Sequence, residues 1–363
     1  MKKLLCVLCM ALSLVACSEE KSDKPVVKIG ATLPLSGNIA YIGQAAKHSL
    51  QMVLDKWKTK NTKYEYEIVY EDDVLKPQKA VINANKFISL DKVKMVISLF
   101  GVVDRPVDDI ANKNKVISLS CSYGKDMVPE YGVNVGSVNS DIYPSAIKQL
   151  KKDGVKTVAL VGSNSETSSA VLDYAAKHLP SDGIKIVADE RYAVGETDYR
   201  LSIKKLEEKN PDYYIVFGVE PMNTIFAKQF YEITGKNNIA SLGALSGINP
   251  DNLPNVDGMW SVYVLCNNEK FEKEFFEKYH VRVENCSANL YDGLDMIITA
   301  FENVAPNPDT GIPDNEDVLE YVKSIEQWDG AFGPMNIEQN GIMRADVPVR
   351  FFQGGKWVTS LDK

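Results

Sequence analysis

The sequence has few histidines, fewer basic than acidic residues, and no long hydrophobic run in its body. Each shortage excludes a class of protein. Three histidines stand singly among 363 residues, none with a second histidine four residues away, so we expect no zinc or other metal site. The formal net charge is −8, whereas a surface that binds nucleic acid would need a basic stripe. No stretch after the first seventeen residues is long enough to span a membrane.

Motifs for nucleotide binding and for serine hydrolysis are also missing. No G-x-G-x-x-G follows the first strand-like run and no G-x-x-x-x-G-K-[ST] occurs, so we expect no cofactor. A nucleophile elbow needs serine third of five residues, whereas residues 243–247 have Ser246 fourth. The acidic pairs Asp72-Asp73 and Asp108-Asp109 are expected to be solvated. We therefore expect no catalytic residues and no enzyme.

The first seventeen residues are the apolar exception. Lys2 and Lys3 precede a mainly apolar run over residues 4–15, which fits a signal peptide and is too short for a membrane span. The run ends in Leu-Val-Ala-Cys17 and resembles a bacterial lipoprotein signal. This implies a signal peptide over residues 1–16, a lipid anchor at Cys17 and a linker over 17–25, with the body in the periplasm or at the cell surface. The alternative is an ordinary secretory signal in which Cys17 has no special role.

Three cysteines, Cys121, Cys266 and Cys286, remain in the body. An exported protein can keep disulfides. Cys266 and Cys286 flank one amphipathic segment and could close a loop of about twenty residues, worth roughly 3 kcal/mol in the chain-entropy model. Two buried free thiols are the alternative. Cys121 then has no expected partner.

The chain after the linker alternates strand-like runs with helical segments, which is typical of parallel sheets covered by helices. Two consecutive series of this kind predict an α/β fold with two lobes, as the length of the chain also favours. Strands are expected at 26–33, 64–70, 93–99, 116–119, 157–161, 184–188, 213–217, 239–242, 347–352 and 356–358, and helices at 46–57, 77–89, after Pro106, and at 143–152, 167–178, 199–209, 221–234, 287–304 and 316–327.

One block of sequence is more specific than this alternation. Residues 28–37 read KIGATLPLSG, and Ala40-Tyr41-Ile42-Gly43 opens the next helix. Further blocks follow in order along the chain: Glu71-Asp72-Asp73 with Pro77 and Ala80, Asp91-Lys92-Val93, Thr197-Asp198-Tyr199 with Asn210-Pro211-Asp212, and Phe332-Gly333-Pro334 with Asn340-Gly341. Together they resemble the branched-chain amino-acid (Leu/Ile/Val) family of type I periplasmic solute-binding proteins.

The resemblance implies two discontinuous Rossmann-like lobes with mainly parallel sheets, which close on a small ligand about a hinge. Lobe 1 is expected to comprise residues 26–138 and 266–332, and lobe 2 residues 139–265 and 333–363. Three crossover segments are expected near residues 136–141, 262–267 and 331–337.

Ligands of open α/β sheets bind beyond the carboxyl ends of the strands. In lobe 1 this places Tyr41, Phe100 and Gly101 near the ligand, together with Ser120, Cys121 and Ser122. The resemblance implies that Ser120 and Ser122 hold a ligand carboxylate, while Gly101 replaces a third hydroxyl donor. The alternatives are helix-capping serines and, for Tyr41, simple surface packing.

In lobe 2 the corresponding candidates are Thr167, Glu220 and Ser246. The family usually places an acidic residue near Ser246 to pair a ligand ammonium, and this chain has none there. Glu220 could supply the charge, or could be a solvated carboxylate in the first turn of a helix.

The sequence thus predicts a lipid-anchored solute-binding protein of an ABC importer that binds a small polar or carboxylate-bearing molecule, such as an amino acid. Its expected partners are that ligand and a membrane permease, with no nucleic acid, and we expect a monomer. The alternative is an extracytoplasmic sensor that signals to a membrane kinase.

Overall fold

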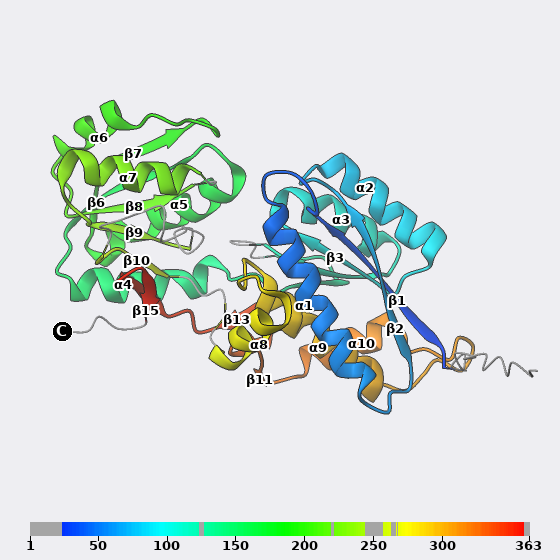
Figure 1. The fold of residues 1–363 in the computed structure, drawn as a ribbon. Coiled ribbons are helices and arrows are strands. Elements are labelled where there is room, and N and C mark those ends of the chain that lie inside the picture. Colours follow the sequence, from blue (N-terminus) through cyan, green and yellow to red (C-terminus); the bar gives the residue numbers. More distant parts are fainter. Residues whose placement is uncertain are drawn as a thin grey trace, which may run out of the picture.

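The computed structural model describes residues 24–122, 127–218, 221–243, 257–262, 266 and 268–358. They form two α/β lobes side by side (Figure 1). Lobe 1 carries the sheet that contains the first strand of the chain, and lobe 2 carries the sheet of the second series. The mixed α/β fold with parallel sheets in two lobes is confirmed.

The sheet of lobe 1 has five parallel strands in the order β2-β1-β3-β4-β5. Its strands are β1 (Val26–Leu33), β2 (Glu65–Asp72), β3 (Met95–Leu99), β4 (Ile117–Cys121) and β5 (Gly132–Asn134). The helices of this lobe are α1 (Ala40–Lys58), α2 (Pro77–Lys86), α3 (Gly101–Lys113), α8 (Glu269–Tyr279), α9 (Ser287–Asn303) and α10 (Asn315–Lys323), with a π-helical turn at Phe87–Asp91.

Helices cover both faces of this sheet, which is why its central strands are apolar on both sides. Met95, Ile97 and Leu99 of β3 pack in the same cluster as the buried residues of α1 and α9. Val96, one position along, packs instead with α2 and α3. Because side chains alternate across a strand, a continuous apolar run identifies a strand that is buried on both faces.

The sheet of lobe 2 has seven strands in the order β15-β14-β10-β9-β8-β6-β7. They are β6 (Thr157–Ser163), β7 (Lys185–Tyr192), β8 (Tyr213–Phe217), β9 (Ile239–Ser241), β10 (Trp260–Val262), β14 (Val349–Gln353) and β15 (Lys356–Val358). The first five of these are parallel, whereas β14 and β15 add an antiparallel edge from the end of the chain. Its helices are α4 (Asn139–Lys152), α5 (Glu166–His178), α6 (Arg200–Glu207) and α7 (Met222–Thr234), with a short 3₁₀ turn at Leu179–Asp182. α4 and α5 pack in one core cluster, and α6 and α7 in the other.

A small third sheet was not expected from the sequence. It contains β11 (Trp328–Asp329), β12 (Pro334–Ile337) and β13 (Met343–Ala345), all antiparallel. An isolated bridge pairs Ile342, just before β13, with Asn134 at the end of β5. The third predicted crossover, at residues 331–337, therefore runs into a sheet next to the last strand of lobe 1.

Two helices begin earlier than the sequence predicted, and each contains a proline. α3 begins at Gly101 and α4 at Asn139, so that Pro106 and Pro144 lie inside these helices. Each proline is close to the helix start and lacks a backbone N–H, so only one helical hydrogen bond is lost in each helix. The carbonyl without this donor is that of Val102 for Pro106 and that of Ser140 for Pro144. The earlier start of α3 matters because it brings the helix N-terminus directly to the end of β3.

Candidate ligand-binding cleft

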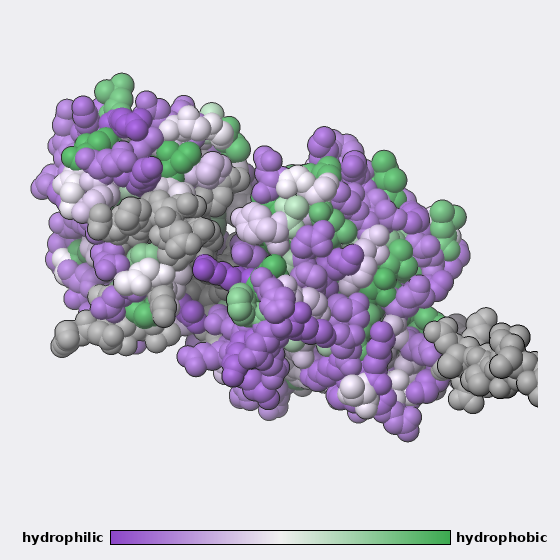
Figure 2. Space-filling view, viewed as in Figure 1, coloured by the Kyte–Doolittle hydropathy of each residue, from purple (hydrophilic) through white to green (hydrophobic). Residues whose placement is uncertain are grey.

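The surface is notched between the two lobes (Figure 2). An ion pair joins the Arg105 guanidinium, near the start of α3, to the Glu166 carboxylate, the first residue of α5. Both side chains are exposed. This pair shows that the starts of the two helices, one from each lobe, lie near each other. No sequence pattern predicted this contact, because nothing in the sequence relates residues of different lobes.

The loop after β1 is fixed by Asp72 at the end of β2. Its Oδ1 accepts hydrogen bonds from the backbone N–H groups of Leu35 (2.9 Å) and Val74 (3.0 Å), and its Oδ2 accepts from the Ser36 hydroxyl (2.5 Å). Burial acts to raise the pKa of Asp72, but these hydrogen bonds outweigh it and lower the pKa. Asp72 is therefore a positioning carboxylate rather than a solvated one.

Its neighbour Asp73 is fully buried, which also corrects the expectation that these acidic pairs are solvated. Asp73 accepts from the Thr32 hydroxyl at 3.0 Å, and Asn83 donates to the same hydroxyl oxygen at 3.0 Å. In the other pair, Asp108 is also buried, on α3. These carboxylates lie within the fold of lobe 1.

The junction between β3 and α3 places backbone amides at the cleft. Phe100 has a left-handed backbone with φ of 72° and its N–H donates to the Cys121 carbonyl, 3.3 Å away. Its own carbonyl accepts from Val103 and Asp104, so the helix turns immediately. The N–H groups of Gly101 and Val102, in the first turn, donate to no acceptor among the residues that the structure describes. Such amides at a helix N-terminus suit an anion.

Gly101 lies next to Ser122, because a Cβ built on Gly101 would be 3.8 Å from the Ser122 hydroxyl oxygen. The structure thus brings together the β3 and β4 ends that the sequence predicted to be neighbours. Ser120 and Cys121 are fully buried and Ser122 nearly so. The Ser120 hydroxyl contacts the Val133 carbonyl at 3.4 Å.

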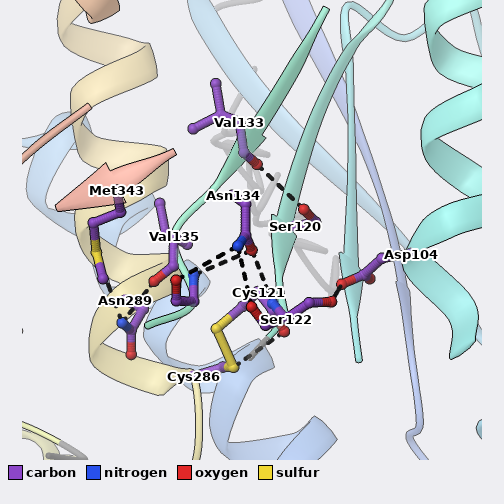
Figure 3. The surroundings of a disulfide bond; sticks show 11 residues. Asp104, Ser120, Cys121, Ser122, Val133, Asn134, Val135, Cys286, Asn289 and Met343 are labelled. Atoms are coloured by element: carbon purple, nitrogen blue, oxygen red, sulfur yellow. Dashed lines mark hydrogen bonds between the residues drawn. A yellow bond between two sulfur atoms is a disulfide. The ribbon is translucent and has the colours of Figure 1, made fainter. Parts of the chain in front are cut away.

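Asn134 holds the loop that contains Ser122 (Figure 3). Its Oδ1 accepts from the N–H groups of Ser122 (2.9 Å) and Gly136 (3.2 Å), and its Nδ2 donates to the Ser122 carbonyl (3.1 Å). Gly136 leaves no room for a side chain, since a Cβ there would lie 2.3 Å from the Ser122 carbonyl oxygen. This one asparagine fixes both the end of β4 and the first predicted crossover.

Asp104 is a site residue that the sequence reasoning missed. It is fully buried in the first turn of α3, and the Ser122 hydroxyl donates its hydrogen bond to one of its carboxylate oxygens (Figure 3). The single proton of Ser122 is then committed to Asp104, and only the lone pairs of the Ser122 oxygen remain for a ligand. The sequence shows an acidic residue shortly after the end of a predicted strand, which could have marked Asp104 as a candidate. The sequence could not show that its partner is Ser122.

The predicted disulfide between Cys266 and Cys286 is wrong. Cys286 is bonded to Cys121, across 165 residues of chain, and joins the end of β4 to the residue before α9 (Figure 3). Cys266 is a buried free thiol whose sulfur lies 2.9 Å from the Ala331 carbonyl oxygen, and burial raises its pKa to about 12. The prediction rested only on the short loop between Cys266 and Cys286. The packing of α9 against β4 instead brings Cys286 to Cys121. Because Cys121 is disulfide-bonded and fully buried, its sulfur offers no ligand contact.

Asp292 of α9 holds the third crossover. Its two carboxylate oxygens accept from the N–H groups of Ala331 (2.8 Å) and Phe332 (2.7 Å), and a Cβ on Gly330 would collide with it. Burial raises the pKa of Asp292 to about 7, and these two hydrogen bonds only partly oppose that effect. Asn289, one turn earlier, donates at 2.7 Å to the carbonyl of Val135, just before the first predicted crossover. One helix therefore contacts the chain next to two of the predicted crossovers.

In lobe 2 the N-terminus of α5 is capped by Ser165, whose hydroxyl accepts from the Ser168 N–H at 3.3 Å. Thr167 lies in this first turn and is half-buried. After β8, Gly218 exchanges hydrogen bonds with the side chain of Asn223 at 2.8 and 2.7 Å. These contacts hold the start of α5 and the residue that follows β8.

The remaining candidates are less well placed or lie outside the described residues. Tyr41, in the first turn of α1, is 47% exposed. Glu220, Ser246 and Cys17 fall outside the described residues, so their roles stay predictions. Within the described residues no group of histidine, cysteine and acidic side chains could hold a metal ion, and no helix is long and apolar enough to cross a membrane.

Comparison with known proteins gives the same picture. A family model described as periplasmic binding protein matches residues 26–356. The Leu/Ile/Val-binding protein of Citrobacter freundii is 25% identical over 223 residues, which cover 59% of this chain and 59% of that protein. The matched region thus spans about three fifths of that relative.

Solved structures share the fold over almost the whole chain. A leucine-binding protein from Thermotoga maritima superposes with a TM-score of 0.78 at 20% identity, covering 92% of this chain and 98% of that one. An ABC-transporter solute-binding protein from Rhodopseudomonas palustris, in complex with 3,4-dihydroxybenzoic acid, gives 0.79 at 18% identity, with 92% and 95% covered. The fold, the blocks of sequence and the family match agree: this chain belongs to the periplasmic binding protein family.

Proposed function

We propose that this protein is the extracytoplasmic solute-binding component of an ABC importer, anchored by a lipid at Cys17, and that it closes its lobes on a small carboxylate-bearing molecule. The observation that carries the proposal is that the starts of α3 and α5, one from each lobe, lie near each other and are joined by the Arg105–Glu166 ion pair. Each helix N-terminus carries about half a positive charge. A ligand between them contacts both lobes only when they are close, so its binding favours closure.

The contacts of Ser122 refine the expected ligand chemistry. Because the Ser122 hydroxyl donates its hydrogen bond to Asp104, its oxygen can only accept a hydrogen bond from the ligand. The ligand carboxylate then binds the amides of Gly101 and Val102, and a donor group of the same ligand meets the Ser122 oxygen. Leucine and 3,4-dihydroxybenzoic acid, named for two proteins of similar fold, both carry a carboxylate and a donor. Amino acids and hydroxy acids are therefore the classes to test.

A thermal-shift screen of amino acids, hydroxy acids and plain carboxylates tests this proposal. At 100 times its dissociation constant a true ligand adds about 2.7 kcal/mol to the free energy of unfolding. The ligand that is found should bind about tenfold more weakly to Ser122→Ala, because one hydrogen bond is lost. Ser118→Ala, within β4 but away from its carboxyl end, is the matched control. If Ser120→Ala combined with Ser122→Ala leaves the affinity unchanged, the site assignment is wrong.

A further inference from the structure

A second concave site lies on lobe 1, where the described chain begins. A groove of about 480 Å³ runs between the C-terminal end of α1 and the start of β2. Three lysines line it, Lys24, Lys58 and Lys60, together with the aromatic rings of Trp57, Tyr64 and Tyr66. Lys24 is the first residue that the structure describes, so the groove adjoins the point where the linker enters the body.

Two lysines of this groove, Lys58 and Lys60, are available to an external anion. Lys58, Lys60 and neighbouring Lys63 are exposed, and no carboxylate of the described residues lies within ion-pair distance of them. The Lys60 ammonium instead lies 3.7 Å above the centroid of the Trp57 ring. Such a cation remains partly hydrated and able to pair with phosphate.

The acidic groups nearby are mostly engaged. Glu65 is the one carboxylate that lines the groove among the described residues. On its flank, Glu302 accepts from the Tyr66 hydroxyl at 2.7 Å and from the Lys63 N–H at 2.8 Å, and Asp295 pairs with Lys56 at 2.6 Å. The groove is therefore locally positive on a chain whose formal net charge is −8.

We infer that this groove docks on anionic phospholipid headgroups of the membrane to which the protein is tethered. The inference rests on the proposed anchor at Cys17. The segment from Cys17 to Lys24 reaches at most about 25 Å even when extended, so the groove lies within reach of the bilayer surface. Lysines near an anionic bilayer are attracted to it at short range.

Docking of this kind would orient the receptor as well as retain it. An anionic bilayer attracts the groove and repels the acidic remainder of the body, so one face of lobe 1 is held against the membrane. A lipid chain combined with a basic surface also anchors more firmly than one signal alone. The cleft between the lobes is formed by other loops and stays open to solution.

Vesicle binding by the mature chain without its lipid tests the inference. Residues 17–363 carrying Cys17→Ser should co-sediment with vesicles of equal parts phosphatidylcholine and phosphatidylglycerol, but not with phosphatidylcholine alone, and less so at high salt. The triple variant Lys58→Glu, Lys60→Glu and Lys63→Glu should bind at least about tenfold more weakly. The matched control Lys204→Glu, Lys205→Glu and Lys209→Glu makes the same charge change at exposed positions in and just after α6 of lobe 2 and should bind like the parent.

Two outcomes overturn the inference. One is that the parent chain does not bind anionic vesicles. The other is that both triple variants lose vesicle affinity equally, which would mean that net charge alone determines binding. Thermal unfolding of each variant checks that the fold is intact. The chain tested carries no lipid, so vesicle binding reports on the groove alone. The proposed lipid anchor is tested separately, by membrane fractionation of the native lipoprotein. Ligand affinity of the groove variant should equal that of the parent.

Discussion

At the scale of single residues, the most consequential side chains are three acids that accept hydrogen bonds. Half-buried Asp72 positions the loop after β1, buried Asp104 accepts the hydrogen bond of the Ser122 hydroxyl, and buried Asp292 holds the third crossover. Asp72 and Asp292 accept from backbone N–H groups of loops, which need acceptors because no helix or sheet supplies one. These acids make the cleft and hinge loops depend on the protonation state of the protein.

Asp292 should make the protein less stable as pH rises. Its pKa in the folded state, about 7, exceeds the ordinary aspartate value of 3.8, so between these values the folded state holds a proton that the unfolded state has lost. The free energy of unfolding therefore falls as pH rises from about 4 to about 7. In Asp292→Asn this part of the slope should disappear, as measured by urea denaturation across that range.

Asp72→Asn is the opposing control for this prediction. The pKa of Asp72 is lowered, so its contribution is present above the unfolded pKa and lost on acidification. Removing it should weaken the protein at neutral pH and less so in acid. Identical pH slopes for the parent and Asp292→Asn would refute the role given to Asp292.

At the scale of elements, the sequence predicted the strands and helices better than the links between them. The spacing of apolar residues located β1, β8 and α9 closely. This works because the faces of a strand or helix that are buried determine which positions in the sequence are apolar. The spacing also placed Ser120 and Ser122 at a strand end. It could not pair Cys121 with Cys286 or Asp104 with Ser122, because these contacts depend on how α9 and α3 pack against β4.

The disulfide should stabilise the junction between β4 and α9. Replacing both cysteines, Cys121→Ala with Cys286→Ala, should cost roughly 2–5 kcal/mol in the free energy of unfolding, because a long loop in the unfolded chain is no longer closed. Urea denaturation with and without reductant measures this. Ligand affinity should fall too, since the bond lies within the loop that carries Ser122.

Cys266→Ala provides the matched control for the disulfide. Its thiol is buried but unbonded, so this variant should keep the full sensitivity of the parent to reductant. The double variant should show none. If reductant destabilised the double variant as much as the parent, the bond between Cys121 and Cys286 would not account for the effect.

At the scale of the whole molecule, two features bear on the angle between the lobes. The first is α9 of lobe 1, where Asn289 and Asp292 hold the chain at Val135 and at Ala331, next to the first and third predicted crossovers. The second is the exposed ion pair between Arg105 of lobe 1 and Glu166 of lobe 2. An exposed ion pair of this kind is strong enough to bias the angle between the lobes without fixing it.

The Arg105–Glu166 pair should favour approach of the lobes. An exposed pair of this kind contributes about 0.2–1 kcal/mol, so Arg105→Ala should weaken ligand affinity by up to about fivefold at low salt and less at high salt. The charge reversal Arg105→Glu should weaken it further, and adding Glu166→Arg should restore much of the loss, since attraction across the cleft returns. Calorimetric titration of the parent, Arg105→Glu, Glu166→Arg and the double reversal gives the coupling free energy. Independent, additive effects of the two reversals would mean that the pair does not act on closure, because a contact that links two lobes must couple the residues that form it.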